Sequence, residues 1–264
     1  MRSTRIVSVA TYERALPVAV ERIWENVLDW EHLPALHKHA FASVRRIDSG
    51  DWGWSAHVRA RGADAREMTV QVVLERERMR YVTATVDGPG KGTEIWTSLT
   101  PKGDHETHIR VEFLVPNVSP ERSATLGEGY RRLYARLWDE DEAMMVRRAR
   151  VLAEARGPKP PRGARLELGS LEEVRAKLPL VVELGGRIWR VVDLDGELAV
   201  HATVCPHWGG PLAGVPIVRD TLECPWHGYR FDVRSGRSCD GRGLRLAAPP
   251  RIETHEKGLV LVSD

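Results

Sequence analysis

Two short segments carry metal-binding side chains at matched positions: Cys205-Pro206-His207 and, after sixteen further residues, Cys224-Pro225-Trp226-His227. Each segment offers one sulfur and one imidazole nitrogen, and together they make a four-ligand set. Thiolates favour iron and zinc, so a tetrahedral zinc site is one interpretation. A zinc finger, however, usually has its cysteines on one loop and its histidines on a helix. Loops that each mix Cys and His suit a two-metal cluster in which one iron takes two Cys and the other takes two His.

The two segments resemble those of the Rieske family, and so do the residues that follow them. The matching neighbours are Gly209, Gly210, Pro211 and Leu212 after the first segment, and Gly228, Phe231, Asp232 and Gly236 after the second. The resemblance implies a [2Fe-2S] cluster whose ligands are Cys205, His207, Cys224 and His227.

The cysteine count separates this chain from the Rieske proteins of respiratory chains. Those proteins carry a further Cys in each loop, joined as a disulfide, and a Ser and a Tyr hydroxyl that donate to sulfur. Here the third and last cysteine, Cys239, lies outside both loops, and the hydroxyl positions hold Tyr229 and Phe231. Fewer donors stabilise the reduced cluster less, so we expect a potential near the low end of the roughly −150 to +300 mV Rieske range.

Length and composition indicate an ordinary globular chain. Its 264 residues are enough for two domains, with 42% hydrophobic residues, 29% charged residues and a formal net charge of +2. Lys and Arg are interleaved with Asp and Glu, which argues against nucleic-acid binding. No apolar run has the length of a membrane span, and the N-terminus has no signal-peptide core, so we expect a cytoplasmic protein.

A basic segment rich in Pro and Gly, residues 156–163, marks a domain boundary. It predicts a first domain over 1–155, a linker over 156–165 and a second domain over 166–264. The second domain is predicted to be all-β, with strands at 180–184, 188–192 and 198–200 before the cluster loops and a closing strand at 259–262.

The first domain is predicted to begin with an extended run, Ile6 to Leu16, and a helix from near Pro17. Six further strands are predicted at 41–47, 53–60, 67–76, 81–87, 92–100 and 107–114, and a long helix from about Pro120 to Ala155. This order resembles the helix-grip fold of START-like domains and gives an α+β fold class. A curved antiparallel sheet around such a helix encloses an apolar cavity, the usual form of a small-molecule site.

The first helix region contains Asp29, His32 and His37 in the spacing D-x2-H-x4-H. This resembles the catalytic helix of Rieske non-haem iron oxygenases, in which two histidines bind a mononuclear iron and the aspartate bridges to the cluster. Asn26 matches an asparagine near that iron. The alternatives are that Asp29 and Pro34 only end a helix, that His37 is a packing residue and that Asn26 is an ordinary helix residue. His39 breaks the motif spacing.

The third iron ligand of that family is an aspartate on the last helix, where this chain has Asp139, Glu140, Asp141 and Glu142. Helical periodicity predicts an apolar stripe, and position 141 falls on it. The stripe consists of Leu126, Tyr130, Leu133, Leu137 and Met144. A carboxylate among apolar side chains loses several kcal/mol of hydration unless it meets a cation, and Fe(II) is such a partner. The alternative for Asp141 is a buried salt bridge to Arg or His, and the other three acids are expected in solvent.

Together the resemblances imply an oxygenase component, a mono- or dioxygenase with its domains in reversed order. Electrons would pass from the Rieske cluster to Fe(II) bound by His32, His37 and Asp141, which activates O2 against a small apolar substrate. In this family the relay through Asp29 crosses between subunits, which implies a homotrimer. No G-x-G-x-x-G fingerprint is present, so a separate NAD(P)H-dependent reductase, with or without a ferredoxin, is implied. The rival hypothesis is a START-like ligand carrier or cyclase fused to a Rieske electron-transfer module, without the mononuclear iron.

Overall fold

The computed structural model describes residues 6–62, 66–157, 163–256 and 258–263. The chain divides into two compact units, Met1–Ala149 and Arg150–Asp264. The first unit combines an antiparallel sheet with helices and the second is mostly strands, so the predicted α+β class is confirmed. Part of the predicted linker, residues 158–162, lies outside the described residues.

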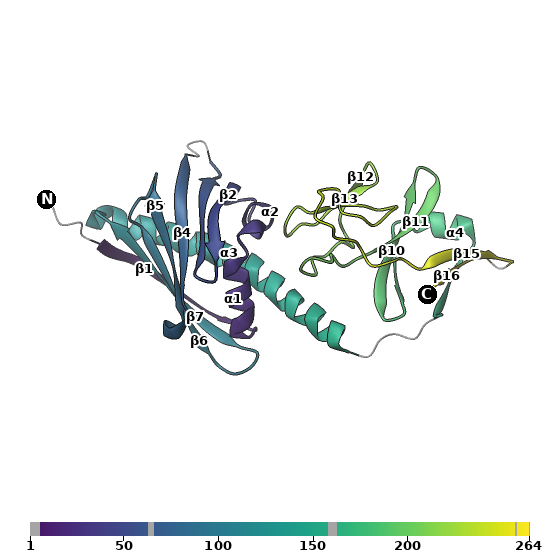
Figure 1. Ribbon diagram of the computed structural model, residues 1–264, viewed down its shortest axis with the longest axis horizontal. Helices are drawn as coiled ribbons and strands as arrows, with labels where there is room; N and C mark the ends of the chain where they lie inside the picture. Colours follow the sequence, from purple (N-terminus) through teal and green to yellow (C-terminus); the bar gives the residue numbers. More distant parts are fainter. Residues whose placement is uncertain (1–5, 63–65, 158–162, 257, 264) are drawn as a thin grey trace. The chain divides into compact units, whose positions relative to one another are not determined.

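A seven-stranded antiparallel sheet forms the frame of the first unit, and it curves around the long helix α3 (Figure 1). Its strands are β1 (Ile6–Leu16), β2 (Phe41–Gly50), β3 (Gly53–Ala60), β4 (Glu67–Glu75), β5 (Arg80–Asp87), β6 (Glu94–Pro101) and β7 (Thr107–Pro116). In the sheet the order is β1-β7-β6-β5-β4-β3-β2, so β1 pairs with the last strand and β2 forms the other edge. All seven predicted strands are present.

The helices of the first unit are α1 (Val20–Leu28), the 3-10 helices η1 (Trp30–His32) and η2 (Arg76–Arg78), the one-turn α2 (Leu33–Leu36) and α3 (Pro120–Arg156). The region of Asp29, His32 and His37, which resembles one catalytic helix in sequence, is therefore divided among η1, α2 and the residue that ends α1. α1 ends at Leu28, and Asp29 leaves the helical region with φ −86° and ψ 78°. On one continuous helix, side chains five residues apart would point about 140° away from each other. His32 and His37 both follow this break, and between them the chain changes from the 3-10 helix η1 to the single turn α2, which ends at Leu36. This departure from one continuous helix lets the two histidines face a common point.

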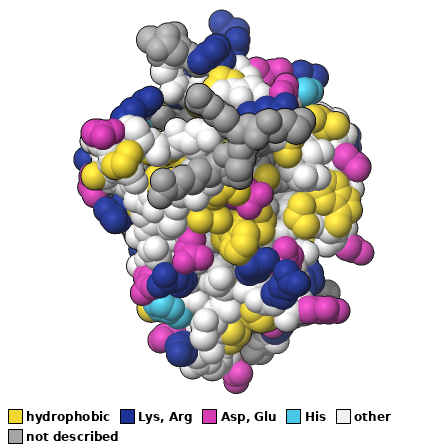
Figure 2. Space-filling view, turned by 90° about the vertical axis from the view of Figure 1, so that its left-hand side faces the viewer, with side chains coloured by type: hydrophobic (Ala, Val, Ile, Leu, Met, Phe, Trp, Pro, Cys, Tyr) yellow, Lys and Arg dark blue, Asp and Glu magenta, His cyan; other side chains and the backbone are white. Residues whose placement is uncertain are grey.

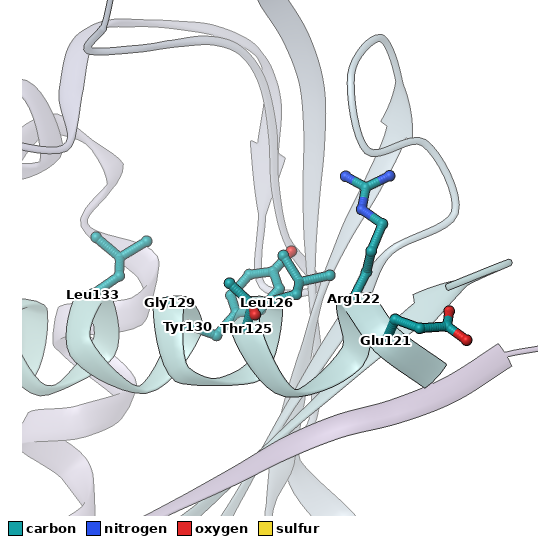
Figure 3. A pocket seen from close by; sticks show the side chains of 7 residues that line it. All are labelled: Glu121, Arg122, Thr125, Leu126, Gly129, Tyr130 and Leu133. Atoms are coloured by element: carbon teal, nitrogen blue, oxygen red, sulfur yellow. The ribbon is translucent and has the colours of Figure 1, made fainter. Parts of the chain in front are cut away.

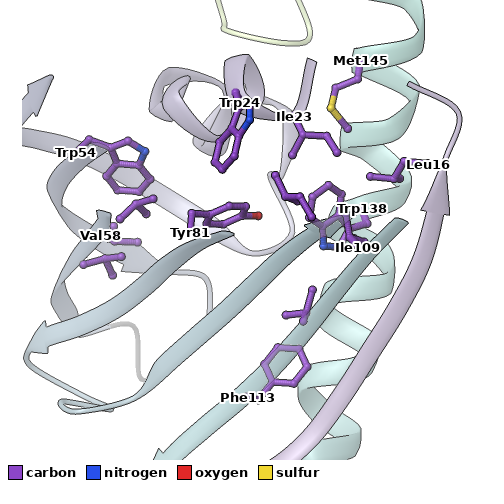
Figure 4. Packing of buried hydrophobic residues seen from close by; sticks show 14 of the residues in the cluster. Leu16, Ile23, Trp24, Trp54, Val58, Tyr81, Ile109, Phe113, Trp138 and Met145 are labelled. Carbon is purple, nitrogen blue, oxygen red and sulfur yellow. The ribbon is translucent and has the colours of Figure 1, made fainter. Parts of the chain in front are cut away.

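Side chains from the sheet, α1 and α3 meet in one buried cluster (Figure 4). On β7 alternate residues are buried, among them Ile109, Val111 and Phe113. This is the period of a strand with one face against a core. Burying a large apolar side chain of this kind stabilises the fold by about 1.5–3 kcal/mol. The cluster ties α3 to the sheet and so fixes the position of the carboxylates that α3 carries.

The buried face of α3 differs from the predicted stripe. Leu126 and Leu133 are 36% and 37% exposed. The buried residues of α3 are instead Gly127, Trp138, Asp141, Met144 and Met145. The face is rotated because the large indole of Trp138 packs into the core cluster. Asp141 lies on the predicted stripe and also on the observed buried face, and it is only 8% exposed.

Gly127 lies where β1 approaches α3 most closely. The pairing of β1 with β7 shifts register between Ser8 and Ala10, and a Cβ added at Gly127 would lie 2.2 Å from the carbonyl oxygen of Val9. We expect Gly127→Ala to destabilise the protein by about 1–3 kcal/mol, because backbone must move. Gly129→Ala, with no atom within 4 Å of the added Cβ, is the matched control. It should stabilise the helix by up to about 1 kcal/mol.

Urea unfolding of the two variants checks this prediction. Equal effects of the two substitutions would show that the contact between β1 and α3 does not limit the size of the side chain at position 127.

The second unit contains three small antiparallel sheets, ordered β11-β10-β9, β12-β13-β14 and β15-β16-β8. The strands are β8 (Arg165–Gly169), β9 (Leu180–Leu184), β10 (Arg187–Leu194), β11 (Glu197–Ala202), β12 (Ile217–Val218), β13 (Thr221–Glu223), β14 (Arg230–Asp232), β15 (Arg251–His255) and β16 (Gly258–Val262). Its helix α4 (Leu171–Ala176) starts with a capping box between Ser170 and Glu173. The strands predicted before and after the cluster loops are all present.

One face of the molecule is shown in Figure 2, where basic and acidic side chains are interspersed and hydrophobic side chains are exposed between them. This mixture agrees with the interleaved charges of the sequence. None of the helices in the described residues is both long and apolar enough to cross a membrane.

Candidate metal centres

Three residues predicted to bind a mononuclear iron come together in the first unit. His32 lies at the end of η1, His37 directly follows α2 and Asp141 lies on α3. All three are buried, and one possible ligand atom from each lies within 4.8 Å of the others. It is the only such group of three or more metal-ligating side chains among the described residues. Two imidazoles and one carboxylate form the donor set of non-haem Fe(II) sites with open coordination positions.

The two histidines present the same ring nitrogen to the carboxylate. Nε2 of His32 lies 3.4 Å from Oδ1 of Asp141, and Nε2 of His37 lies 3.2 Å from the same oxygen. The Asn26 side chain is also buried, and its Nδ2 donates a hydrogen bond of 3.1 Å to this oxygen. A single carboxylate oxygen thus meets three nitrogen atoms, as expected where a cation binds between these groups.

The charged groups around His32 and Asp141 favour a protonated imidazole beside an ionised carboxylate. Burial opposes protonation of the His32 imidazole, but its hydrogen bonds to Asp141 and Asp29 raise the pKa of His32 to about 10. Burial likewise opposes ionisation of Asp141, yet the two histidines hold the pKa of this carboxyl well below its usual range. The site therefore stabilises a positive charge beside a carboxylate, and a metal ion must displace a proton to bind.

Each histidine also has a carboxylate near its other ring nitrogen, Nδ1. Nδ1 of His32 lies 3.4 Å from Asp29, and Nδ1 of His37 lies 2.6 Å from Oε2 of Glu140. A histidine that binds a metal usually donates its other ring N–H to such a group, which fixes the tautomer and the ring orientation. The arrangement leaves both Nε2 atoms to face Asp141, and it fits the donor set of a mononuclear metal.

Glu140 is the residue of this group that the sequence interpretation missed. It was expected in solvent, but its side chain is only 27% exposed, and its second oxygen lies 3.4 Å from Nδ1 of His39. The same expectation is wrong for Glu142, whose side chain is 25% exposed and pairs with Arg14. Its neighbour in the chain, Asp141, faces the core, and adjacent helix residues point about 100° apart. The segment that carries His37 and His39 lies against α3 on the side that Glu140 occupies. His39 itself is not a member of the three-residue group.

We expect Glu140→Gln to lower the affinity for Fe(II) by about 10–100-fold, the usual cost of removing a carboxylate behind a ligand histidine. The amide keeps the size of the side chain but is a weaker acceptor for the N–H of His37. Titration of the metal-free protein with Fe(II) measures the effect. Asp139→Asn is the control, because Asp139 neighbours Glu140, is 66% exposed and pairs with Arg14. Equal losses in both variants would contradict the role assigned to Glu140.

The cluster loops of the second unit are two copies of one turn. In the first, the backbone N–H of Cys205 donates to the carbonyl of Gly210 (2.9 Å), and Gly209 donates back to Cys205 (3.0 Å). In the second, Cys224 donates to Tyr229 (2.8 Å), and Gly228 donates back to Cys224 (2.9 Å). β11 leads into the first loop, and β13 and β14 flank the second. The repeated turn places the two cysteines in equivalent positions, whereas His207 is the second residue after its cysteine and His227 is the third.

The four predicted cluster ligands lie together. The rings of His207 and His227 are 4.5 Å apart, and Cys205 and Cys224 are 2% and 1% exposed. The hydrogen bond between the two sulfurs lowers the pKa of Cys224 and raises that of Cys205, so the pair retains a proton that a metal must displace to bind both sulfurs. A Cβ at Gly210 would lie 2.5 Å from the sulfur of Cys224, so glycine is required beside the sulfur. Two sulfurs, two imidazoles and the space beside Gly210 fit a cluster in which one iron has two Cys ligands and the other has two His ligands.

A pocket of about 450 Å³ lies beside the N-terminal half of α3 (Figure 3). Its lining residues are Glu121, Arg122, Thr125, Leu126, Gly129, Tyr130 and Leu133. The exposed leucines of the predicted stripe therefore line this pocket instead of the core. Tyr130 also stacks on Phe113 of the core cluster, with ring centroids 4.8 Å apart.

Comparison with known families assigns the second unit. The sequence profile of the Rieske [2Fe-2S] domain matches residues 165–249, a range that includes both cluster loops. This part of the chain is a Rieske [2Fe-2S] domain. The predicted family of this domain is confirmed, and the domain supports a [2Fe-2S] cluster. The assignment of the four ligands stays a prediction.

Two of the curated proteins that share sequence with this chain are the following. This chain is 32% identical over 119 residues to cholesterol 7-desaturase nvd 1 of Ciona intestinalis, and the alignment covers 45% of this chain and 24% of that protein. It is 38% identical over 80 residues to apoptosis-inducing factor 3 of Homo sapiens, which covers 30% of this chain and 12% of that protein. The alignments span a quarter or less of either relative.

Among solved structures the protein is similar to the Zhui aromatase/cyclase from a Streptomyces species, with 12% identity and a TM-score of 0.47. The match covers 56% of this chain and 98% of the cyclase. The element order and sheet order described above agree with the predicted START-like arrangement of the first unit.

Proposed function

We propose that the protein is the oxygenase component of a Rieske oxidation system. It accepts electrons at the Rieske cluster and uses them for the O2-dependent oxidation of an apolar substrate beside His32, His37 and Asp141. The main evidence for this proposal is the buried group of two imidazoles and one carboxylate. Asp29 and Glu140 lie close to the Nδ1 atoms of the two histidines.

The Rieske domain alone does not select this function, and the two aligned curated proteins have quite different names. The first unit supplies the distinction. An electron-transfer module fused to a ligand carrier has no need of a buried 2-His-1-carboxylate group. A salt bridge to a single histidine would also compensate the buried charge of Asp141. Such a bridge does not explain why two histidines face Asp141, each with a second carboxylate near its Nδ1 atom.

In this proposal each residue has a distinct task. His32, His37 and Asp141 would hold Fe(II), which when bound supplies the open coordination positions at which O2 is activated. Asp29 and Glu140 accept the Nδ1 protons of the histidines and keep both Nε2 atoms directed to one point. Asn26 donates to Asp141 and holds its carboxylate in place. Cys205, His207, Cys224 and His227 hold the cluster.

The substrate is expected to be a small or medium-sized apolar molecule, and a sterol is one candidate because the aligned relative is a cholesterol desaturase by name. Hydroxylation, demethylation and desaturation all fit the same site. A separate NAD(P)H-dependent reductase, directly or through a ferredoxin, would supply the electrons. A homotrimer, in which Asp29 links the cluster of one subunit to His32 of the next, extends the proposal to the assembly.

A single-turnover assay tests the proposal. The cluster of the iron-loaded protein is reduced chemically, excess reductant is removed, and O2 is added with a panel of sterols and aromatic compounds. Product formation with reoxidation of the cluster, and its loss after selective removal of the mononuclear metal, would support the proposal. Reoxidation without product from any compound, at equal rates with and without that metal, would favour an electron-transfer module.

A further inference from the structure

The chain segment after the second cluster loop is unusually basic. Between positions 230 and 251 it has six arginines and only two acidic residues, Asp232 and Asp240. Most of the remaining chain interleaves the two signs of charge, apart from the basic segment at residues 156–163. None of these arginines belongs to either proposed set of metal ligands.

The fold gathers four of these arginines near one another. Arg237 and Arg245 are partners in an antiparallel bridge, so their side chains point to the same side of the ladder. Arg230 lies on the adjacent strand, where its carbonyl accepts a hydrogen bond of 2.9 Å from Cys239. Arg242 lies in the turn between the bridged residues. All four are exposed, and we call Arg230, Arg237, Arg242 and Arg245 the arginine face.

Three of the four guanidinium groups have no acidic partner. Among the described residues, no carboxylate lies within ion-pair distance of Arg230, Arg237 or Arg245, while Arg242 pairs with Asp240 at 3.2 Å. Like charges placed opposite each other on neighbouring strands are destabilising. The pair Arg237 and Arg245 therefore has a cost within the chain that an anionic partner would offset.

One member of the arginine face, Arg242, lies one aromatic ring away from the cluster histidines. The Tyr229 ring is 4.6 Å from the ring of His207 and 5.5 Å from that of His227. Arg242 lies over the same tyrosine ring at 4.0 Å and donates a hydrogen bond of 2.8 Å to its hydroxyl. A partner bound to these arginines is thus close to the imidazoles, through which an electron can enter the cluster over a short distance.

We propose that the arginine face docks an acidic electron-transfer protein and guides it to the histidine side of the Rieske cluster. An exposed positive patch raises the rate of encounter with a negatively charged partner, and the effect falls with ionic strength. Nucleic acid would also be attracted by the charge, but the position of the patch beside the cluster ligands favours a redox protein. The inference rests on the proposed electron-accepting role of the cluster and not on the mononuclear iron.

Stopped-flow reduction of the holoprotein tests the inference, with a reduced plant-type ferredoxin as the acidic donor. We expect Arg237→Glu/Arg245→Glu to lower the second-order rate constant at low ionic strength roughly tenfold or more, since steering changes such rates by about 10–1000-fold. The difference should vanish in high salt. Oxidation of the reduced cluster by a basic cytochrome c should become faster in the same variant, because the sign of the attraction is reversed.

The control is Arg175→Glu/Lys177→Glu, which makes the same change of charge on exposed residues at α4. Arg175 contacts Gly196 in the turn between β10 and β11, at the end of β11 opposite to the one that leads to Cys205. The absorption spectrum and the reduction potential of each variant show whether the cluster is intact. Equal slowing of both variants, or no slowing of the first with an intact cluster, would overturn the proposal. Binding of a nucleic acid probe with no effect on ferredoxin kinetics would overturn it as well.

Discussion

Asp141→Ala is expected to abolish O2-dependent substrate oxidation while leaving the Rieske cluster unchanged. The substitution removes the only carboxylate among the three buried groups that face one point. Loss of an outer partner of a metal ligand already costs about 10–100-fold in affinity, and loss of the ligand itself should cost more. Iron analysis, turnover and the cluster spectrum, measured on the same sample, check the prediction.

Asp141→Asn separates metal binding from packing. The amide is nearly the same size and can still accept the hydrogen bond from Asn26, but it carries no negative charge. We expect it to keep the fold and to lose most of the bound iron and the activity. Full activity in Asp141→Asn, with iron retained, would remove Asp141 from the proposed site.

Cys224→Ser should have the second large effect, the loss of the [2Fe-2S] cluster and of every activity that needs it. Cys224 is buried, pairs with Cys205 and has a lowered pKa that favours the thiolate, whereas a serine hydroxyl stays protonated. Because cluster binding is coupled to folding of the loops, the unit should also unfold at a lower temperature. The visible absorption of the cluster and thermal unfolding measure the two effects.

Cys239→Ser is the matched control for this prediction, since Cys239 is exposed and lies outside both cluster loops. It should keep the cluster, the spectrum and the stability of the original protein. If Cys239→Ser lost the cluster and Cys224→Ser kept it, the ligand assignment would be wrong.

Local sequence signals were sufficient for most of the fold. The strands of the first unit have alternating side chains and clear turns between them, as at Gly88, Gly90 and Gly92, which all have positive φ. The cluster loops are recognisable because their ligands are close in sequence and their turns need glycine at fixed positions. Such features depend on near neighbours, which the sequence displays directly.

Features that depend on the approach of distant segments were harder to predict. The apolar stripe of α3 was placed on Leu126 and Leu133, but the sheet packs against Gly127 and Trp138, where a missing side chain and a large ring fit its shape. The role of Glu140 depends on a loop more than one hundred positions earlier in the chain. The change from the 3-10 helix η1 to the single turn α2 between His32 and His37 was not predicted. Asp141 was placed correctly because it lies on both possible faces of the helix.

The arginine face is a surface feature that the sequence displays only in part. The six arginines are visible in the sequence, but their meaning depends on the bridge that sets Arg237 opposite Arg245 and on the stacking of Arg242 over Tyr229. Neither contact follows from periodicity.

Iron content per chain tests the central claim most directly. The protein is reconstituted with iron and sulfide, freed of loosely bound metal and analysed for total iron and acid-labile sulfide. With two irons in the cluster and one at the histidines, we expect about three irons and two sulfides per chain, falling to about two irons in Asp141→Ala. About two irons in both proteins, with sulfide unchanged, would contradict a mononuclear site at His32, His37 and Asp141.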